Sequence, residues 1–386
     1  MKENRLFLAA TYILLCLSAS NFYEKGSICF LLLIILFLWN AKGKLIIQAE
    51  TAISAILGLT IFIFGAFQSD FTLCIKSINY AFSFCLGCFI FGQKYDKDKL
   101  FENVMMSLFA GASLYAAITY IYNAGIGFST RRILYDYWTK SEINVTGVGI
   151  ITAMVSGFSF YGILICKNKL IKASTLILTA ISLSLSLISA TRGPILLFIL
   201  CWLFMMIIYA KTISSKKLLG FSFTALIVCG VIYFKVIPSS KFQRIVSQIP
   251  VFSRLSEEGL HTGRTVLLRK FIEGLIDYPF GGAHVSGLIG QEAHTVLLEA
   301  GDLYGIFGFL MISLIMISSV YKCFQLIKKV KNAPVLFSVI GFYFVTIIES
   351  NLEPVLNGYP VLIWCLSFVN GLVTMYLQHS ERKIIE

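Results

Sequence analysis

Long apolar runs separated by short polar segments extend along almost the whole chain of 386 residues. A helix that crosses the hydrocarbon core of a bilayer needs roughly 17 to 25 mostly apolar residues, and runs near this length, several of them short, predict twelve transmembrane helices. The predicted spans are residues 6–20, 27–39, 46–68, 71–92, 101–121, 144–166, 171–190, 194–210, 217–236, 302–321, 334–349 and 361–377. This pattern predicts an all-α, polytopic integral membrane protein.

One long polar stretch interrupts this pattern between the ninth and tenth predicted spans, from about residue 235 to residue 301. Three of the four histidines lie within it: His261, His284 and His294. The chain therefore divides into three predicted parts: nine helices in residues 1–236, a large loop in 237–301, and three helices with a terminal tail in 302–386. The loop is where charge, water and proton transfer can meet.

Residues 264–277 of this loop have the periodicity of an amphipathic helix. Its apolar residues recur at steps of three and four: Leu267, Leu268, Phe271, Ile272, Leu275 and Ile276. The charged residues of the segment fall mostly on other faces, and Tyr278 and Pro279 follow it as a helix stop. We expect this helix to lie along the outer surface of the bilayer and not to cross it.

Basic residues alternate regularly with the predicted spans. The inner loops and the tail hold most of them: Lys42, Lys44, Lys94, Lys97, Lys99, Lys167, Lys169, Lys172, Lys211, Lys216, Lys217, Lys322, Lys328, Lys329, Lys331, Arg382 and Lys383. The short outer loops hold almost only Lys25 and Arg192. Because positive residues mark the cytoplasmic side, this asymmetry predicts an even number of spans, both termini in the cytoplasm and the large loop outside.

Composition narrows the function classes. The chain is 57% hydrophobic and only 13% charged, which excludes an ordinary soluble domain. Its net charge of +12 would suggest nucleic acid in a soluble protein, but here the basic residues serve as orientation signals, so we expect no nucleic-acid partner. Cys85 and Cys88 form a CLGC spacing that suits redox chemistry or a metal, or simply one face of a buried helix; without a second such pair the helix face is favoured.

Arg192, in the sequence ATRGP, occupies a very tight outer turn between two apolar runs. An arginine so close to hydrocarbon faces a wet cavity or a bound anion, or else extends to phospholipid headgroups. Pro194 stands where a helix begins, so Arg192 could share an anion with the free N–H groups of that helix start. We expect Arg192 to bind a substrate anion.

Arg264 opens the predicted amphipathic helix. Its planar guanidinium could bind a phosphate with two hydrogen bonds, although a solvated residue in a first helical turn has the same sequence signature. A second outer segment, residues 123–144, mixes aromatic and basic side chains and suits the membrane interface. Arg131 of that segment is a further candidate for substrate binding.

His294 lies a few residues before the tenth predicted span, in QEAHTVLLEAGDLYGIFGFL. A neutral imidazole there could remove a proton from a sugar hydroxyl, or be a hydrogen-bonded bystander. Glu299 could orient the histidine, act as a second acid or base, or only shield the entry of the span. His261 and His284 are too widely spaced for a compact metal motif, so no metal is expected.

Lys76 is a charge within the fourth predicted span, and Asp302 and Glu349 lie near the outer ends of theirs. Such charges line a common cavity or pair with each other, and Lys76 is a further candidate for substrate binding. No phosphate-binding loop or dinucleotide fingerprint is present. An enzyme of this kind would need no cofactor and would use an already activated substrate.

Three motifs in this order, ATRGP, GRTVLLRKFIEGLIDYPFGG and AHTVLLEAGDLYGIFGF, with a large outer loop between spans nine and ten, resemble the O-antigen polymerase and O-antigen ligase superfamily. The resemblance covers about residues 144–322 well and the rest by topology. It implies a GT-C-like membrane fold in the bacterial inner membrane, with the active site facing the periplasm. Its members transfer a glycan from undecaprenyl diphosphate to an acceptor sugar, without metal or nucleotide.

The resemblance also implies roles for individual residues. Arg192 and Arg264 match the arginines that hold the diphosphate, and His294 matches the general base. The asparagine that usually follows this histidine is Thr295 here, whose shorter side chain leaves the acceptor contact open. The expected partners are an undecaprenyl diphosphate-linked oligosaccharide, membrane lipids and a chain-length regulator.

Three functions compete. A polymerase lengthens the lipid-linked repeat chain, and a ligase attaches the finished chain to the lipid A core; both share donor and leaving group. The divergent motifs and Thr295 favour the polymerase. A twelve-helix transporter or flippase also fits the span count, but related halves with polar residues near mid-bilayer, which are typical of such proteins, are not evident in the sequence.

Overall fold

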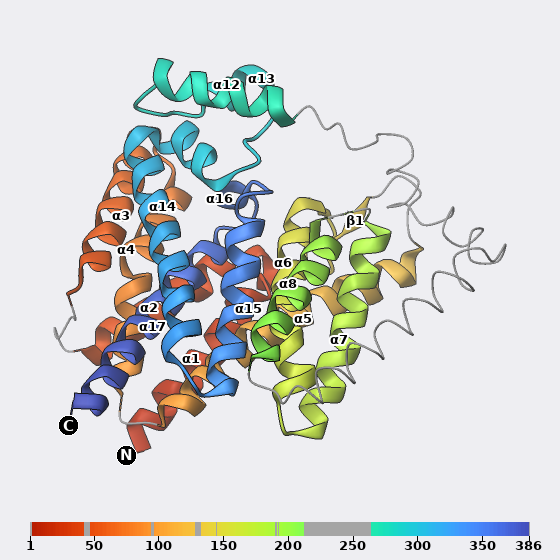
Figure 1. Cartoon of the computed structure of the whole chain (residues 1–386). Helices are drawn as coiled ribbons and strands as arrows, with labels where there is room; N and C mark the ends of the chain where they lie inside the picture. Colours follow the sequence, from red (N-terminus) through yellow and green to blue (C-terminus); the bar gives the residue numbers. More distant parts are fainter. Residues whose placement is uncertain are drawn as a thin grey trace.

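The computed structural model describes residues 2–41, 47–93, 96–127, 133–143, 145–189, 191, 193–211 and 264–385, with residues 264 and 265 as helical backbone. Most of the described helices run in a roughly common direction and form a bundle (Figure 1). Both chain termini lie at one end of the bundle, and the helices α12 and α13 lie across the opposite end. This arrangement has the termini on the same side, as the charge pattern predicts.

Helices make up nearly all of the described residues. In the N-terminal part these are α1 (Lys2–Ala19), η1 (Phe22–Glu24), α2 (Gly26–Ala41), α3 (Ala49–Gln68), α4 (Phe71–Gly92), α5 (Lys97–Ile126), α6 (Val145–Phe160) with its π-helical end η2 (Tyr161–Ile165), α7 (Lys169–Ile188) and α8 (Gly193–Ala210). The C-terminal part contains α12 (Arg264–Asp277), α13 (His284–Ile289), α14 (Val296–Lys329), α15 (Ala333–Glu349), α16 (Val355–Gly358) and α17 (Val361–Ile385). The two short strands β1 (Leu134–Tyr135) and β2 (Glu142–Ile143) pair antiparallel.

Eight helices of the described residues have the length and apolar composition needed to cross a bilayer. Three shorter apolar helices add to them: Arg5–Ala19, Gly26–Ala41 and Ala333–Glu349. The prediction of an all-α, multi-pass membrane protein is therefore confirmed. The ninth predicted span, residues 217–236, lies outside the described residues together with residues 237–263 of the predicted loop, so the count of twelve stays a prediction.

Helix α14 begins at Val296, earlier than the span predicted from residue 302, and it is interrupted at Gly305. The backbone there is not helical, with φ 70° and ψ −165°. The segment before α13 fills the interruption: Ile306 donates its N–H to the Pro279 carbonyl at 2.8 Å, and Gly282 donates to Leu303 at 3.1 Å. A broken helix is stable where other backbone groups satisfy those it frees, so α12 and α13 are joined to the bundle through the main chain.

Two pairs of helices approach each other closely at glycines. Gly157 of α6 faces Gly341 of α15, and a Cβ at either position would overlap the backbone of the other helix. Gly87 of α4 and Gly371 of α17 form a second such contact. Small residues let helix backbones pack tightly within a membrane, where little else drives association. These contacts set the spacing of the bundle.

Replacing Gly341 by leucine is expected to destabilise the protein by about 1–3 kcal/mol, because the added side chain has no space against Gly157. Thermal unfolding in detergent, followed by fluorescence-detected size exclusion, should show a melting temperature several degrees lower. Gly125→Leu is the matched control, since a Cβ at Gly125 meets no atom within 4 Å. Equal melting temperatures for the two variants would contradict the close α6–α15 contact.

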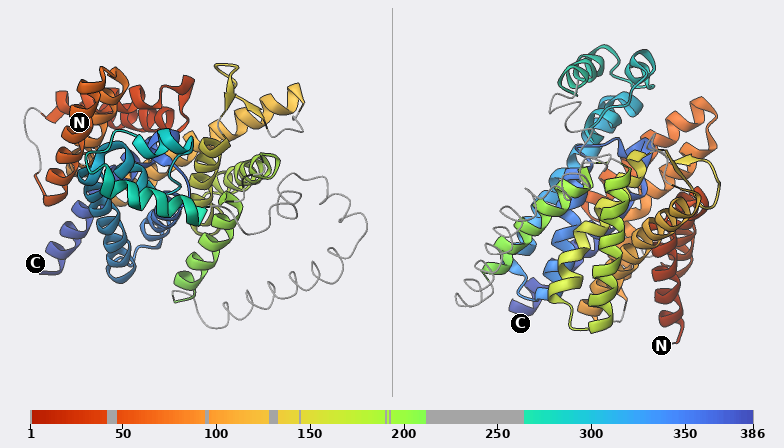
Figure 2. Two further views of the ribbon diagram at one scale, coloured as in Figure 1. Left: turned by 90° about the horizontal axis from the view of Figure 1, so that it is seen from above. Right: turned by 90° about the vertical axis from the view of Figure 1, so that its right-hand side faces the viewer.

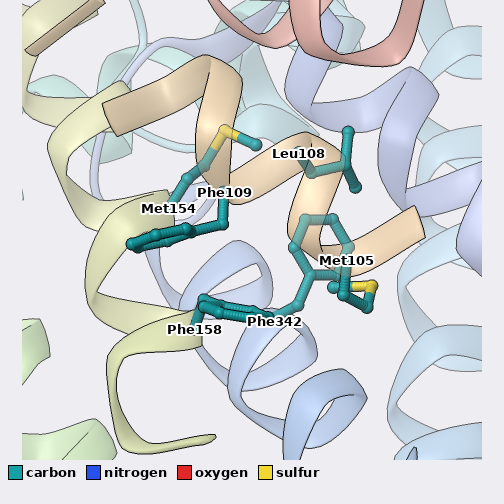
Figure 3. A pocket seen from close by; sticks show the side chains of 6 residues that line it. All are labelled: Met105, Leu108, Phe109, Met154, Phe158 and Phe342. Carbon is teal, nitrogen blue, oxygen red and sulfur yellow. The ribbon is translucent and has the colours of Figure 1, made fainter. Parts of the chain in front are cut away.

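A small cavity lies where α5, α6 and α15 meet (Figure 3). Its lining is apolar and consists of Met105, Leu108, Phe109, Met154, Phe158 and Phe342. Its volume of about 10 Å³ is at the lower limit for one water molecule, which would lack polar partners there. It is a packing void of the core and not a candidate site.

Lys322, predicted to lie in an inner loop, is instead inside α14 and only 4% exposed. Its ammonium donates to Oε1 of Glu50 on α3 at 2.7 Å and to Oγ of Ser318 at 2.5 Å. The loop assignment was wrong because a lysine within an apolar helix has the same sequence signature as one just beyond its end. A buried charge requires such a partner, so this ion pair connects α3 with α14.

Candidate functional site

The end of the bundle opposite the termini brings together the start of α14 and the connection between α15 and α17. Helix α15 ends at Glu349, and the chain turns back through α16 before α17 begins. Val296, the first residue of α14, donates its N–H to the Ser350 carbonyl at 2.7 Å. The residues directly before α14 therefore lie beside the α15–α17 connection.

His294 and Glu353 face each other across this junction. Nδ1 of His294 is buried and lies 3.5 Å from Oε2 of Glu353, within ion-pair distance but without hydrogen-bond geometry. The two side chains are 33% and 20% exposed, so the pair is largely shielded yet reachable. With Nδ1 turned toward a carboxylate, Nε2 is the nitrogen that points away from it. A carboxylate behind an imidazole orients the ring and stabilises its protonated form.

Sequence reasoning missed Glu353. It lies in the short segment between the predicted spans 334–349 and 361–377, four residues after Glu349, and belongs to no recognisable motif. The available signal was an acidic residue in a short outer loop. That signal gains meaning only when the fold places the loop against His294.

Glu299 is 2% exposed and both of its carboxylate oxygens accept backbone hydrogen bonds. Oε2 accepts from the N–H of Leu356 at 2.8 Å, and Oε1 accepts from the N–H of Asn357 at 2.7 Å. The first N–H groups of a helix have no partner within it, and a carboxylate satisfies them well. Glu299 thus fastens α16 to α14. This arrangement favours a positioning role, and direct contact with substrate stays a prediction.

Thr295 is the N-cap of α14. Its Oγ1 accepts the N–H of Leu298 at 3.3 Å, and its extended backbone (φ −141°, ψ 135°) precedes the first helical turn. Threonine and asparagine both serve well at this position. Thr295 therefore supports the helix start that follows His294, while a contact of Thr295 with the acceptor stays a prediction.

Arg192 lies outside the described residues, but the helix start that follows it in sequence is described. Helix α8 begins at Gly193 with Pro194 next, as predicted. A Cβ at Gly193 would lie 3.7 Å from Oε2 of Glu349, which is fully buried at the end of α15. Because the next residue, Ser350, binds Val296, the start of α8 and the start of α14 lie at the same junction.

Helix α12 has the bounds that the periodicity predicts, and it begins at Arg264. One side of it is packed: Phe271 is 3% exposed, and Leu275 lies against Gly301 of α14. Another side exposes apolar residues: Val266, Leu268, Ile272 and Ile276. Seen along the bundle, α12 and α13 lie over the part that contains α14 (Figure 2).

The remaining predicted site residues are less closely grouped. The side chain of Arg264 and the whole of Arg131 lie outside the described residues. Lys76 of α4 is half-buried and within electrostatic range of Asp70 and Glu299. Among the described residues, His294, Thr295 and Glu299 thus lie together at the start of α14. Lys76 lies on the neighbouring helix α4, within electrostatic range of Glu299.

Asp302 serves the attachment of α13. Its Oδ1 accepts the N–H of Val285 at 2.9 Å, and its Oδ2 accepts the hydroxyl of Ser286 at 2.5 Å. Pairing of Asp302 with another intramembrane charge, one of the two predicted alternatives, is therefore not observed in the described residues. The carboxylate holds α13 on α14.

Within the described ranges no three His, Cys, Asp or Glu side chains form a group that could hold a metal ion. Cys85 and Cys88 are buried, and the Cys88 thiol donates to the Gly371 carbonyl of α17 at 3.6 Å. This supports the interpretation of the CLGC segment as one packed face of a buried helix. The chemistry available at the junction is that of an imidazole with a carboxylate.

No protein-family model matches the chain, and no curated protein is significantly similar to it in sequence. The O-antigen resemblance therefore depends on the three motifs and their order, and the function is argued from the junction.

Proposed function

We propose that the protein is a metal-independent, inverting O-antigen polymerase, which transfers a glycan from undecaprenyl diphosphate to the acceptor sugar of a lipid-linked repeat unit. The observation that carries the proposal is the pairing of His294 with Glu353 at the end of the bundle opposite both termini. An imidazole backed by a carboxylate is the arrangement of a general base. The motif order supplies the substrate class.

In the proposed reaction an acceptor hydroxyl attacks the anomeric carbon of the donor sugar. Nε2 of His294 takes the hydroxyl proton, a C–O bond forms, and the bond from the anomeric carbon to the diphosphate breaks with its electron pair leaving on the diphosphate. Glu353 stabilises the imidazolium. Arg192 and Arg264 stabilise the departing charge, with Lys76 and Arg131 as further substrate contacts. A single displacement inverts the anomeric configuration.

The proposed location is the bacterial inner membrane, with both termini in the cytoplasm and the His294 junction facing the periplasm. Two observations support this orientation. The termini lie together (Figure 1), and Lys97, Lys169 and Lys329 occupy the helix ends that the alternation of spans assigns to the terminal side. Positive residues concentrate on the cytoplasmic side of membrane proteins.

Deleting the coding sequence tests the proposal through the lipopolysaccharide of the host cells. A polymerase defect leaves the core with a single repeat unit. Bare core with accumulated lipid-linked polymer would instead identify a ligase, and lipid-linked single repeats retained in the cytoplasmic leaflet would identify a flippase. Unchanged lipopolysaccharide would overturn the whole proposal.

Glu353→Gln is expected to lower kcat about tenfold or more with both KM values within about twofold of wild type. The reason is that the carboxylate charge acts on the imidazolium, which forms only during proton transfer. Glu353→Asp should restore part of the rate. Glu273→Gln, at an exposed residue of α12, is the matched control. A raised KM with unchanged kcat would show that Glu353 acts in binding, and a lowered melting temperature that accounts for the loss would show that its role is structural.

A further inference from the structure

A cavity of about 490 Å³ lies between α13, the segment that joins α13 to α14, and α16. Residues from three parts of the chain line it, among them Ser286, Gly287, Gln291, Glu292, Leu303 and Asn357. Its volume falls within the range of about 300–1,000 Å³ that is typical of small-molecule sites. It is distinct from the apolar void of the core and lies at the end of the molecule that contains His294.

The lining favours a neutral, hydroxyl-rich ligand. It offers two amides and a carboxylate, which together can donate to and accept from sugar hydroxyls, and the Ser286 hydroxyl, which donates to Asp302, can still accept. Gly287 and Gly290 expose backbone where a ligand can approach closely, and Leu303 adds one apolar surface. The residues that line this cavity in the described structure include no lysine or arginine. A diphosphate, which needs cationic partners, therefore fits it poorly.

Two residues of the lining, Glu292 and Asn357, are close in sequence to the two members of the His294–Glu353 pair. Glu292 precedes His294 by two positions, and Asn357 follows Glu353 in the α15–α17 connection. The backbone of Asn357 is fixed by Glu299 at 2.7 Å, and α13 is fixed by Asp302 through Val285 at 2.9 Å. Fixed walls of this kind hold a reactant at a constant distance from a base.

We propose that this cavity binds the acceptor glycan and presents its hydroxyl to His294. This inference rests on the proposed transferase function and adds that acceptor and donor bind at separate places. The acceptor sugar occupies this cavity, and the donor diphosphate binds elsewhere, because the described lining offers it no cation. Ser286, Gln291, Glu292 and Asn357 are the residues that select the acceptor sugar.

The test fills the cavity at Gly287. A Cβ at Gly287 meets no atom within 4 Å, so a tryptophan there enters the cavity without a backbone clash. Leu288→Trp is the matched control, because Leu288 is on the same short helix, 77% exposed and not part of the lining. The probe is the oligosaccharide released by mild acid from the host cells' own surface polysaccharide, and its binding to the full-length protein in nanodiscs is measured by saturation-transfer NMR and calorimetry.

Wild type and Leu288→Trp are expected to bind the oligosaccharide, and Gly287→Trp to bind it about tenfold or more weakly. In the transfer assay Gly287→Trp should raise the KM of the acceptor and leave the KM of the donor unchanged. If Gly287→Trp does not fold, the double variant Gln291→Ala with Glu292→Ala removes polar lining groups and should give the same result.

The outcomes separate this inference from the proposed function. Oligosaccharide binding that is absent in wild type, or equal in Gly287→Trp and Leu288→Trp, overturns the cavity assignment even where transfer is normal. If the wild-type protein binds the oligosaccharide but transfers no glycan, and Gly287→Trp does not bind it, the cavity is a sugar site and the transferase proposal is overturned. A donor KM that rises with the acceptor KM overturns the separate binding of acceptor and donor.

Discussion

His294→Ala is expected to lower the rate of glycan transfer about 10²–10⁴-fold, the contribution typical of a positioned general base. The loss follows because Nε2 of His294 takes the proton in the proposed reaction, and the neighbouring carboxylate of Glu299 is already bound to the N–H groups of Leu356 and Asn357. The measurement is the O-antigen ladder of a complemented deletion strain at equal protein level, followed by transfer kinetics with purified protein.

His284→Ala is the control for this prediction. His284 lies at the same end of the molecule and stacks on Tyr278 with ring centroids 4.7 Å apart. Its replacement should leave the ladder unchanged. A normal ladder from His294→Ala would remove the general base from the mechanism, and the pair with Glu353 would then be a structural contact.

Arg264→Ala is expected to lower kcat about 10²–10³-fold, because one cation that stabilises the departing diphosphate is lost. Arg264→Lys should recover little, since an ammonium cannot form the two parallel hydrogen bonds of a guanidinium. The donor is supplied as lipid-linked repeat unit to protein in nanodiscs, and single-turnover rates are compared at saturating acceptor.

Arg269 offers the matched control on the same helix. Its guanidinium donates to Glu273 at 2.8 Å on the exposed side of α12, and this hydrogen bond raises the pKa of Arg269. An exposed ion pair contributes little to the stability of the fold. Arg269→Ala should therefore transfer glycan at the wild-type rate. An equal decrease in kcat for Arg264→Ala and Arg269→Ala would indicate that α12 contributes only general positive charge and that neither arginine binds the diphosphate specifically.

The sequence predicted the features that depend on local periodicity. The spacing of Leu267, Phe271 and Leu275 sets the bounds of α12, and Pro194 marks the start of α8. The CLGC segment was interpreted correctly because small residues in an apolar run are typical of packed helices. In each case a few neighbouring residues determine the structure.

Features that depend on contacts between distant residues were not predicted. The start of α14 was placed too late because the charge of Glu299 lowers the apolar character of its first turn. That carboxylate accepts backbone hydrogen bonds from α16, which the linear pattern does not reveal. Lys322 was assigned to a loop because its partner Glu50 precedes it by 272 positions. Glu353 likewise gains its significance from the fold alone.

The attachment of α12 and α13 through main-chain hydrogen bonds at the Gly305 break determines which substitutions this outer unit tolerates. Amide and carbonyl groups are the same in every residue, so the exposed side chains of this outer unit can be exchanged without weakening these hydrogen bonds. Gly281, Gly282 and Gly305, with φ of 76°, 103° and 70°, are the positions where that freedom ends. Substitutions elsewhere in the outer unit should therefore be tolerated where those three glycines are kept.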